Sequence, residues 1–346
     1  MTSQTDFMRC SLIRSFSLVP GLVFLFGCGN TSNSRHDVHQ KDIPVYELVK
    51  DWPHLPKGYV LGQVTGVDVD TSQNIVLIHR GWRRWKLNAT FPDTPISANT
   101  ILVVDRKTGK LLNSFGANLF IMPHGLSVDK ENNVWITDIG LQQIFKFTHD
   151  GKLLMKLGEA RIPANDSTHF DHPTDVAVAT DGSFYVSDGY RNSRVIKFSK
   201  EGKYLFQWGN KGSGEGEFNI PHGIDLDSRG NVYVADRENN RIQKFDSTGN
   251  FVTQWKNDVA KQLSALSVEN NDLVAIDHLT INDTLIKGSD VIVFDSTVKL
   301  VTRFGRTGLY DGPVCRYHDI TIDNEGSIYI GDILGNQIQK FTVKSH

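Results

Sequence analysis

The stretch Gly223-Ile-Asp-Leu-Asp-Ser-Arg-Gly-Asn-Val-Tyr-Val-Ala-Asp236 holds two short runs of alternating apolar residues separated by a turn. The same pattern returns with little change in residues 125–138, 175–188 and 319–332, and two degenerate copies begin at Gly66 and Ala265. A period of two, interrupted by turn residues every 8 to 12 positions or so, predicts β-strands rather than helices.

Each copy is followed by a third run, such as Arg241–Phe245, and by a turn and a fourth run, such as Tyr204–Gly209. Four strands in about 50 residues are the signature of one blade of a β-propeller. The six copies therefore predict an all-β, six-bladed β-propeller that fills residues 46–346 as one domain. The blades resemble NHL repeats, most clearly in Ala235–Phe245.

Composition describes an ordinary globular chain: of 346 residues, 39% are hydrophobic and 22% are charged. Lys and Arg number 37 and Asp and Glu number 39, which gives a net charge of −2. This balance offers no broad basic surface for a polyanion, so nucleic acid is not an expected partner. We expect a monomer.

The N-terminus has the features of an export signal. Arg9 and Arg14 precede the apolar run Leu18–Phe26, which is shorter than the ~20 residues that a membrane span needs. The run ends at Gly27-Cys28 and resembles the bacterial lipoprotein box. We expect cleavage after residue 27, a lipid on Cys28, a flexible tether over 28–45 and an envelope location with the lipid as the only membrane contact. Simple secretion and an uncleaved anchor are the alternatives.

Equivalent positions of the six blades should face the central axis at equivalent heights. The position just before each innermost strand reads, from the first blade to the sixth, Thr65, His124, Thr174, His222, Ser264 and His318. Histidine in alternate blades predicts three imidazoles that converge roughly 120° apart and leave a position open, as in catalytic zinc sites. The alternatives are that each histidine only packs at the start of a strand, or that Cys315 closes a structural zinc site.

The next position reads Gly66, Gly125, Asp175, Gly223, Ala265 and Asp319. Glycine allows backbone carbonyls to approach the axis closely, and a hard cation such as calcium binds carbonyl and carboxylate oxygens. Asp319 is the candidate carboxylate, and a solvated or hydrogen-bonded aspartate is the alternative.

A second set of equivalent positions directly follows the Asp that ends each second strand, and it reads Arg80, Ile139, Gly189, Arg237, His278 and Ile333. Arg80 and Arg237 belong to opposite blades, so we expect them to reach over the metal and bind a carboxylate. Tyr190, one residue beyond this set, is a candidate general base, a role that requires a lowered pKa. The alternative is that each arginine pairs with an aspartate. We interpret His79, His169 and His278 as packing or surface residues.

These residues and the motifs around them resemble peptidyl-α-hydroxyglycine α-amidating lyase, the second catalytic half of the peptide-amidating enzyme. The similarity runs from Leu61 to Phe341, and it is carried by Leu61–Val67, His79–Gly81, Asn118–Phe120, Pro123–Leu126, Pro173–Val178, Ser187–Tyr190 and Val234–Asn239. It implies zinc on His124, His222 and His318. It also implies structural calcium on Asp319 and the carbonyls of Val67 and Leu126, active-site arginines at Arg80 and Arg237, and a catalytic tyrosine at Tyr190.

The resemblance implies a lyase that cleaves the C–N bond of a small anionic or peptidyl α-hydroxyglycine, giving an amide and glyoxylate. This chain departs from the animal enzyme at Arg316, which replaces an active-site Met, and at two disulfides, replaced by Asp171 with Arg191 and by Tyr233 with Lys244. We expect no copper monooxygenase domain before the propeller, so another α-hydroxy amide or ureido acid is a possible substrate. Two alternatives stay open: a calcium-dependent propeller hydrolase or lactonase, and a noncatalytic propeller that binds peptides or cell-envelope ligands.

Overall fold

The computed structural model describes residues 43–85, 90–258, 262–269, 272–281, 285–295, 297–305 and 314–344. The predicted signal, Cys28 and the tether up to residue 42 lie outside these ranges. No described helix is long and apolar enough to cross a membrane.

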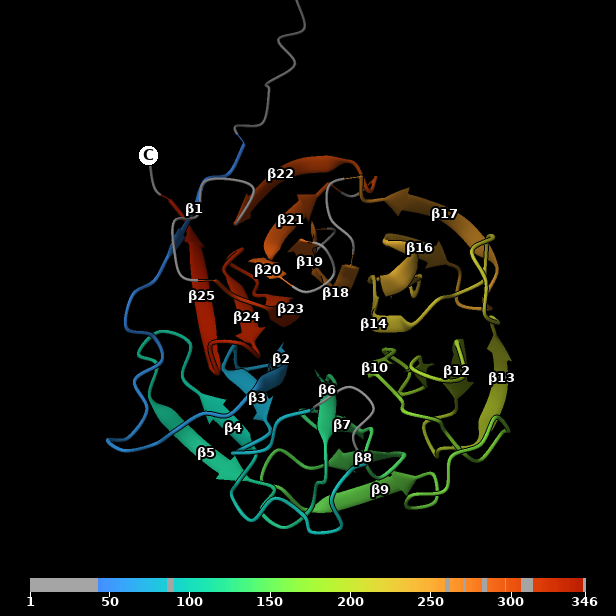
Figure 1. Ribbon diagram of the computed structural model, residues 1–346, viewed down its shortest axis with the longest axis horizontal. Helices are drawn as coiled ribbons and strands as arrows, with labels where there is room; N and C mark the ends of the chain where they lie inside the picture. Colours follow the sequence, from blue (N-terminus) through green and yellow to red (C-terminus); the bar gives the residue numbers. More distant parts are fainter. Residues whose placement is uncertain are drawn as a thin grey trace, which may run out of the picture. The chain divides into compact units, whose positions relative to one another are not determined.

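The unit from Ile43 to His346 is a ring of six antiparallel sheets around a central axis, and Figure 1 shows their innermost strands gathered about that axis. The predicted six-bladed β-propeller is confirmed. The first blade comprises β2 (Val64–Val69), β3 (Ile75–His79), β4 (Ile101–Val104) and β5 (Leu111–Phe115). The second comprises β6 (Pro123–Val128), β7 (Val134–Asp138), β8 (Gln143–Phe147) and β9 (Leu153–Leu157).

The third blade comprises β10 (Asp175–Val178), β11 (Phe184–Asp188), β12 (Arg194–Phe198) and β13 (Tyr204–Trp208). The fourth comprises β14 (Pro221–Leu226), β15 (Val232–Asp236), β16 (Arg241–Phe245) and β17 (Phe251–Lys256), with a single 3-10 turn, η1 (Arg237–Asn239), after β15. The fifth comprises β18 (Gln262–Glu269), β19 (Asp272–Ile281), β21 (Asp290–Phe294) and β22 (Leu300–Gly305), and β20 (Leu285–Gly288) pairs with the end of β19.

The sixth blade takes its strands from both ends of the described chain. It comprises β23 (Tyr317–Ile322), β24 (Ile328–Asp332), β25 (Gln337–Val343) and, at the outer edge, β1 (Tyr46–Leu48). Tyr46 lies opposite Val343 in an antiparallel ladder, and its ring stacks on Phe304 of the fifth blade at 5.0 Å between centroids. The N-terminal strand therefore closes the ring.

Six apolar clusters of the described core lie at the boundaries between successive blades. Val76 and Ile78 of the first blade, for example, pack with Leu126 and Ile136 of the second. A seventh, smaller cluster of Ile121, Met122 and Ile139 packs beside Trp85 and Tyr190. Because a blade is covered on both faces by its neighbours, every residue of a second strand such as β7 is buried. Alternation between exposed and covered residues is visible in outer strands such as β9.

The turn between the first and second strands of most blades is built on an aspartate. Asp70, Asp129, Asp227 and Asp323 each accept the backbone N–H of the residue four positions later. In this way a local carboxylate satisfies donors that the strand ladder leaves open.

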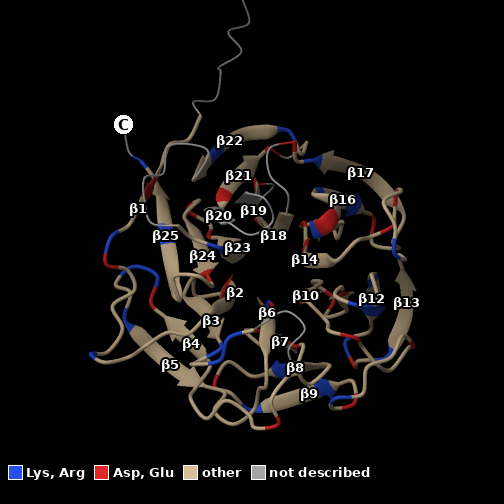
Figure 2. Ribbon diagram, viewed as in Figure 1, with Lys and Arg blue, Asp and Glu red and all other residues tan. Residues whose placement is uncertain are grey.

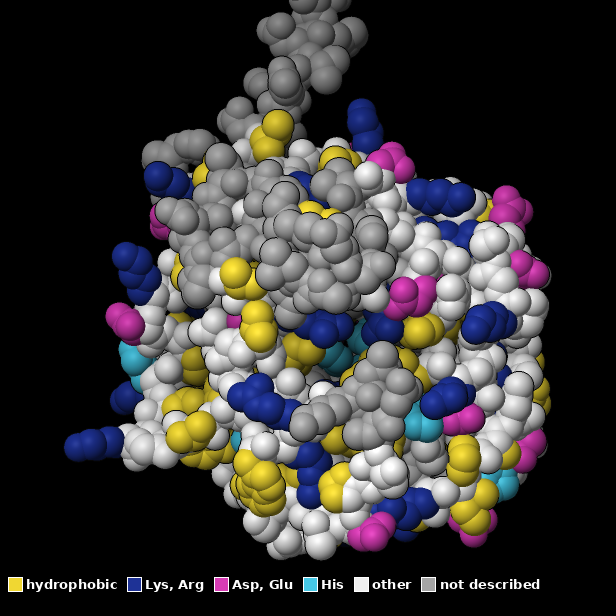
Figure 3. All heavy atoms as spheres, viewed as in Figure 1, with side chains coloured by type: hydrophobic (Ala, Val, Ile, Leu, Met, Phe, Trp, Pro, Cys, Tyr) yellow, Lys and Arg dark blue, Asp and Glu magenta, His cyan; other side chains and the backbone are white. Residues whose placement is uncertain are grey.

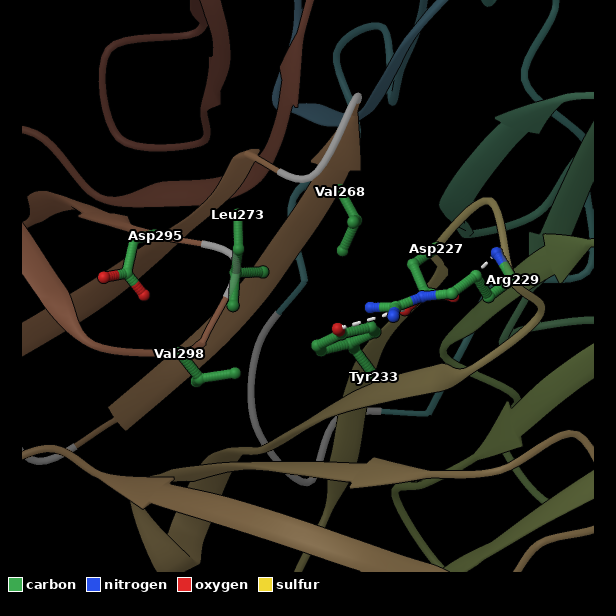
Figure 4. Close-up of a pocket in the computed structure, with 7 residues that line it drawn as sticks. All are labelled: Asp227, Arg229, Tyr233, Val268, Leu273, Asp295 and Val298. Carbon is green, nitrogen blue, oxygen red and sulfur yellow. Dashed lines mark hydrogen bonds and ion pairs between the residues drawn. The ribbon is translucent and has the colours of Figure 1, made fainter.

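Near the Asp227 turn, a cleft of about 260 Å³ separates the fourth and fifth blades (Figure 4). Tyr233 and Lys244 face each other across β15 and β16 here, with 2.6 Å between Nζ and the phenol oxygen, and Nζ lies 3.4 Å from Asp227. The two residues that the resemblance assigns to a disulfide position are thus hydrogen-bonded to each other. Asp171, in contrast, bonds its neighbour His172, and no ion pair joins it to Arg191 among the described residues.

A chain that begins at residue 50 lacks β1, so it should be less stable than a chain that begins at residue 43 and keeps β1. Losing this edge strand and the Tyr46 ring contact should lower the Tm by about 5 °C or more. Thermal unfolding monitored by circular dichroism provides the measurement, with the chain from residue 43 as the control. Equal Tm values would show that β1 does not hold the ring closed.

Candidate functional site

The three histidines at the alternating positions meet on the propeller axis. His124, His222 and His318 lie at the axial start of β6, β14 and β23, and each side chain is buried. Their ring centroids are 4.5 to 5.1 Å apart, and one nitrogen from each lies within 4.8 Å of the others. The predicted convergence is confirmed, while metal binding stays a prediction.

Each imidazole is oriented by the backbone of the next blade around the ring. Nδ1 of His124 donates to the carbonyl oxygen of Thr174 at 2.8 Å, Nδ1 of His222 to that of Ser264 at 2.9 Å, and Nδ1 of His318 to that of Thr65 at 2.8 Å. A carbonyl accepts only, so Nδ1 carries the proton and Nε2 presents a lone pair. The backbone carbonyls of the three blades that lack an axial histidine therefore fix the tautomer of the three histidines.

Two of these residues, Thr65 and Thr174, also form a side-chain hydrogen bond to the strand of the next blade, which carries a histidine. The Thr65 hydroxyl lies 3.2 Å from the carbonyl oxygen of Pro123, and the Thr174 hydroxyl lies 2.8 Å from that of Pro221. Each proline directly precedes a histidine of the site. This role was not predicted from the sequence. Its signal was the hydroxyl side chains that alternate with histidine at the position before each innermost strand.

Burial lowers the pKa of all three histidines well below its ordinary value. Neighbouring imidazoles lower the pKa of His124 and His222 further. Nearby guanidiniums lower the pKa of all three; they belong to Arg80, Arg237 and Arg316. Three neutral nitrogen donors aimed at one point are the ligand set that zinc prefers at an open site. Cys315 is not in this group of described residues; it packs in the core between the fifth and sixth blades.

The loops that lead into the histidines are held by the Asp that ends a second strand. Asp138 accepts the N–H of Met122, Asp236 that of Asn219, and Asp332 that of Arg316. In the first blade His79 takes this place, and its Nδ1 accepts the N–H groups of Gly62 and Gly81. Burial lowers the pKa of His79 to about 4, which keeps it neutral for that role.

Tyr190 projects from the loop after β11 onto the histidines. Its phenol oxygen lies 2.9 Å from Nε2 of His124 and 3.0 Å from Nε2 of His222. The Trp85 ring meets its edge at 4.9 Å between centroids, and the guanidinium of Arg237 lies 5.3 Å from its ring centre. The hydroxyl is thus fixed beside the point where the nitrogens converge.

A pocket of about 550 Å³ opens above this centre. Its lining includes the histidines His222, His278 and His318, the arginines Arg80, Arg237 and Arg316, and the residues Tyr190, Trp85, Gln63, Gln262, Ser264, Tyr317 and Ile333. Figure 3 shows Lys/Arg and His side chains gathered at the centre of this face. The pocket is therefore cationic and leads to the candidate metal ligands.

Arg80 is buried, and its Nε donates to the Pro123 carbonyl at 3.0 Å. Its Nη2 is buried without a partner among the described residues. Burial lowers the pKa of Arg80 to about 10, so it stays charged at neutral pH. Arg237 pairs with Glu238 at 2.9 Å. Neither arginine pairs with an aspartate in the described part of the chain, which disfavours the alternative that they only staple blades.

A second cavity, of about 160 Å³, lies among the histidines and the next level of the inner strands. Asp175 and Asp319, from opposite blades, both line it. Burial raises the pKa of both carboxyls well above the ordinary value. Like-charge repulsion from Asp175 raises the pKa of Asp319 further. Oδ2 of Asp319 accepts the N–H of Val67 at 2.8 Å. Gly125 is required here, because a Cβ would lie 2.5 Å from Oδ1 of Asp175.

His278 is the one histidine of the second set of positions, and the structure shows that it is not a surface residue. Its side chain is 3% exposed and lines the pocket beside Arg237 and Arg316. Its place directly after Asp277, equivalent to Arg80 and Arg237, was the signal in the sequence.

Comparison with known proteins finds similarity to a propeller family and to peptide-amidating enzymes. A family model described as a 6-bladed beta-propeller matches residues 161–286. The rat peptidylglycine alpha-amidating monooxygenase is 38% identical over 318 residues, which cover 85% of this chain and 31% of the rat protein. A Drosophila melanogaster peptidyl-alpha-hydroxyglycine alpha-amidating lyase is 39% identical over 213 residues, which cover 58% of this chain and 51% of the fly protein.

Solved structures give the same architecture. A streptogramin B lyase superposes with a TM-score of 0.55 over 87% of this chain and 98% of its own, at 15% identity, a likeness that concerns the fold alone. The chain spans about a third of the rat protein and about half of the fly protein. In sequence the chain is therefore similar to peptidylglycine-amidating enzymes and peptidyl-α-hydroxyglycine α-amidating lyases, and in fold it is a six-bladed propeller.

Proposed function

We propose that this chain is a zinc-dependent lyase that cleaves the C–N bond of a peptidyl- or other N-acyl-α-hydroxyglycine, producing an amide and glyoxylate. The observation that carries the proposal is the meeting of three neutral imidazoles with Tyr190 and Arg80 at the floor of one pocket. The names of the relatives point to the same substrate class.

His124, His222 and His318 would hold the zinc ion through Nε2. Bound zinc would supply a Lewis acid that makes the substrate hydroxyl more acidic. The carbonyls of Thr65, Thr174 and Ser264 keep the ligand nitrogens neutral and directed at the axis, which favours metal binding before any substrate arrives.

Tyr190 is the group placed to move the proton. Its phenol oxygen accepts the proton of the substrate hydroxyl, the C–O bond becomes C=O, the C–N bond breaks, and the amide nitrogen takes up the proton that Tyr190 accepted. The guanidinium of Arg237, 5.3 Å from the ring centre, packs on the Tyr190 ring. Trp85 holds the ring in place from its edge.

Arg80 and Arg237 bind the carboxylate of the hydroxyglycine. Nη2 of Arg80 has no partner among the described residues, so an incoming carboxylate oxygen satisfies a donor that is otherwise unpaired and buried. Holding the carboxylate above the imidazoles places the carbon that bears the hydroxyl next to Tyr190.

The cavity among the histidines fits a structural calcium ion. Buried carboxylates on opposite blades repel each other, and a hard cation between them removes that repulsion. We propose that Asp319 binds calcium together with the backbone carbonyls of Val67 and Leu126.

We propose in addition that residues 1–27 direct export and that Cys28 carries a lipid, so that the propeller works at the cell envelope as a monomer. These residues lie outside the described structure, and their composition is the support.

Replacing His222 by Ala should remove one of three metal ligands and lower zinc affinity ~100-fold or more. Metal analysis of dialysed protein is the measurement, with about one zinc per wild-type chain expected. His169→Ala is the matched control, because His169 pairs with Asp166 at the surface. Equal zinc in the two variants would remove the proposed centre.

Tyr190→Phe should lower kcat for glyoxylate release from N-acetyl-α-hydroxyglycine by ~10²- to 10⁴-fold, because the proton acceptor is lost. Zinc content should not change. Tyr204→Phe, which removes an exposed phenol, is the control. N-acetylglycine, which lacks the hydroxyl, should not react. Zinc-loaded wild type that turns over no α-hydroxyglycine contradicts the function, and turnover with calcium alone favours a hydrolase.

Calcium in large excess over its Kd should raise the wild-type Tm by several degrees, equivalent to about 3 kcal/mol at a hundredfold excess. Asp319→Asn should lose most of this shift, because the amide cannot supply a charged ligand. Asp150→Asn, at an exposed turn, should keep it. A shift that survives Asp319→Asn would place calcium elsewhere.

A further inference from the structure

We propose that Arg316 and His278 form a second polar subsite that binds an anionic group on the acyl side of the substrate. The substrate class is then a dianionic N-acyl-α-hydroxyglycine, with one carboxylate on the glycine and a second acid group on the acyl part. This inference rests on the proposed function, because it extends the same pocket.

The backbone of Arg316 is fixed independently of its side chain. Its N–H donates to Oδ1 of Asp332 at 3.0 Å, and its carbonyl accepts the N–H of Ile333 at 3.0 Å. The side chain therefore enters the pocket from an anchored loop directly before β23.

Within the described part of the chain, the Arg316 guanidinium makes no hydrogen bond or ion pair. Its side chain is half-buried and lines the same pocket as Arg237. Two partly buried cations in one pocket are unfavourable unless an anion lies nearby. The free fork of Arg316 is suited to a carboxylate.

His278 gives an independent indication from another blade. Its side chain is 3% exposed, lines the same pocket, and its Nδ1 has no partner among the described residues. Burial, followed by the charges of Arg316 and Arg237, lowers the pKa of His278 to about 4. A neutral imidazole has one N–H to donate, and a buried polar group of this kind requires a partner.

The charges in the pocket favour two anionic groups on the substrate. Three arginines line it, and its described lining contains no acidic residue. Glu238 pairs with Arg237 from beside the pocket. The hydroxyglycine carboxylate, bound by Arg80 and Arg237, neutralises one further positive charge. The charge of Arg316 then has no counterion among the described residues of the pocket. A cavity of about 550 Å³ has room for a small acyl group that carries the second acid.

Three substrates test the inference: N-succinyl-, N-succinamoyl- and N-acetyl-α-hydroxyglycine. The first two have nearly the same shape, but only succinyl carries the second carboxylate. We expect wild type to prefer succinyl over succinamoyl by ~10- to 100-fold in kcat/KM, the range of a charged hydrogen bond. Arg316→Met should bring this ratio close to one, and His278→Phe should lower it.

Arg229→Gln is the control, because it removes one positive charge from an exposed turn next to Asp227, at the other end of the strands. It should keep the wild-type ratio. A wild-type ratio near one, with normal turnover of the acetyl substrate, overturns the subsite while the lyase function stands.

Binding separates the two proposals when turnover fails. Calorimetry with unreactive N-succinylglycine and N-succinamoylglycine should give a Kd at least tenfold lower for the first, and Arg316→Met should abolish the difference. If no α-hydroxyglycine is cleaved but this difference is found, the function is wrong and the subsite stands. Equal Kd values for the two ligands overturn the subsite.

Discussion

The hydrogen bond from each axial imidazole to the backbone of the next blade is the constraint on which the site depends. It places the proton on Nδ1, so the Nε2 lone pairs of His124, His222 and His318 point toward one another. Each of these bonds crosses a boundary between blades. The bond from His318 to Thr65 crosses the seam between the last and first blades, which β1 closes at the outer edge through its ladder with β25. Ring closure and ligand orientation are therefore parts of one structure.

The sequence predicts the blades and the axial histidines because both follow from repetition. A four-stranded unit that recurs six times gives each position an equivalent in every blade, so a residue type in alternate copies translates into a threefold arrangement. Nothing in that argument requires knowledge of side-chain contacts. The fold and the convergence of His124, His222 and His318 were predictable for this reason.

Features outside the repeat were not predictable in the same way. β1 has three residues and no repeat pattern, and its partner strand is close to the other end of the chain. The carbonyls of Thr65, Thr174 and Ser264 act through the backbone, so their residue types carry only a weak signal. The pairing of Asp171 with His172 rather than with Arg191 depends on local loop geometry. His278 was in the right set of positions, but its role depends on a pocket that only the structure shows.

Charge changes sign along the axis. Three arginines line the pocket on one side of the imidazoles, and Asp175 and Asp319 line the cavity among and beyond them. Asp68 and Asp225, on opposite inner strands further along, add a second pair of carboxyls, and burial raises their pKa values to about 6 and about 7. Figure 2 marks acidic residues in red and basic residues in blue along the strands. Cations on one side oppose protonation of the imidazoles, and the carboxylates on the other side attract a cation. Neutral imidazole nitrogens thus lie between a pocket lined by arginines and a cavity lined by carboxyl groups.

The candidate metal ligands and the pocket lining are attached to the fold in different ways, which allows one to vary without the other. The histidines begin inner strands. Arg80, Tyr190 and Arg237 follow second strands, and His278 lies near the end of one, β19. Arg316 uses only its backbone N–H and carbonyl to fix its loop. A methionine there, as the resemblance assigns to the animal enzyme, keeps both bonds and removes the charge. Substrate choice can therefore change at this position while the imidazoles keep their hydrogen bonds to Thr65, Thr174 and Ser264.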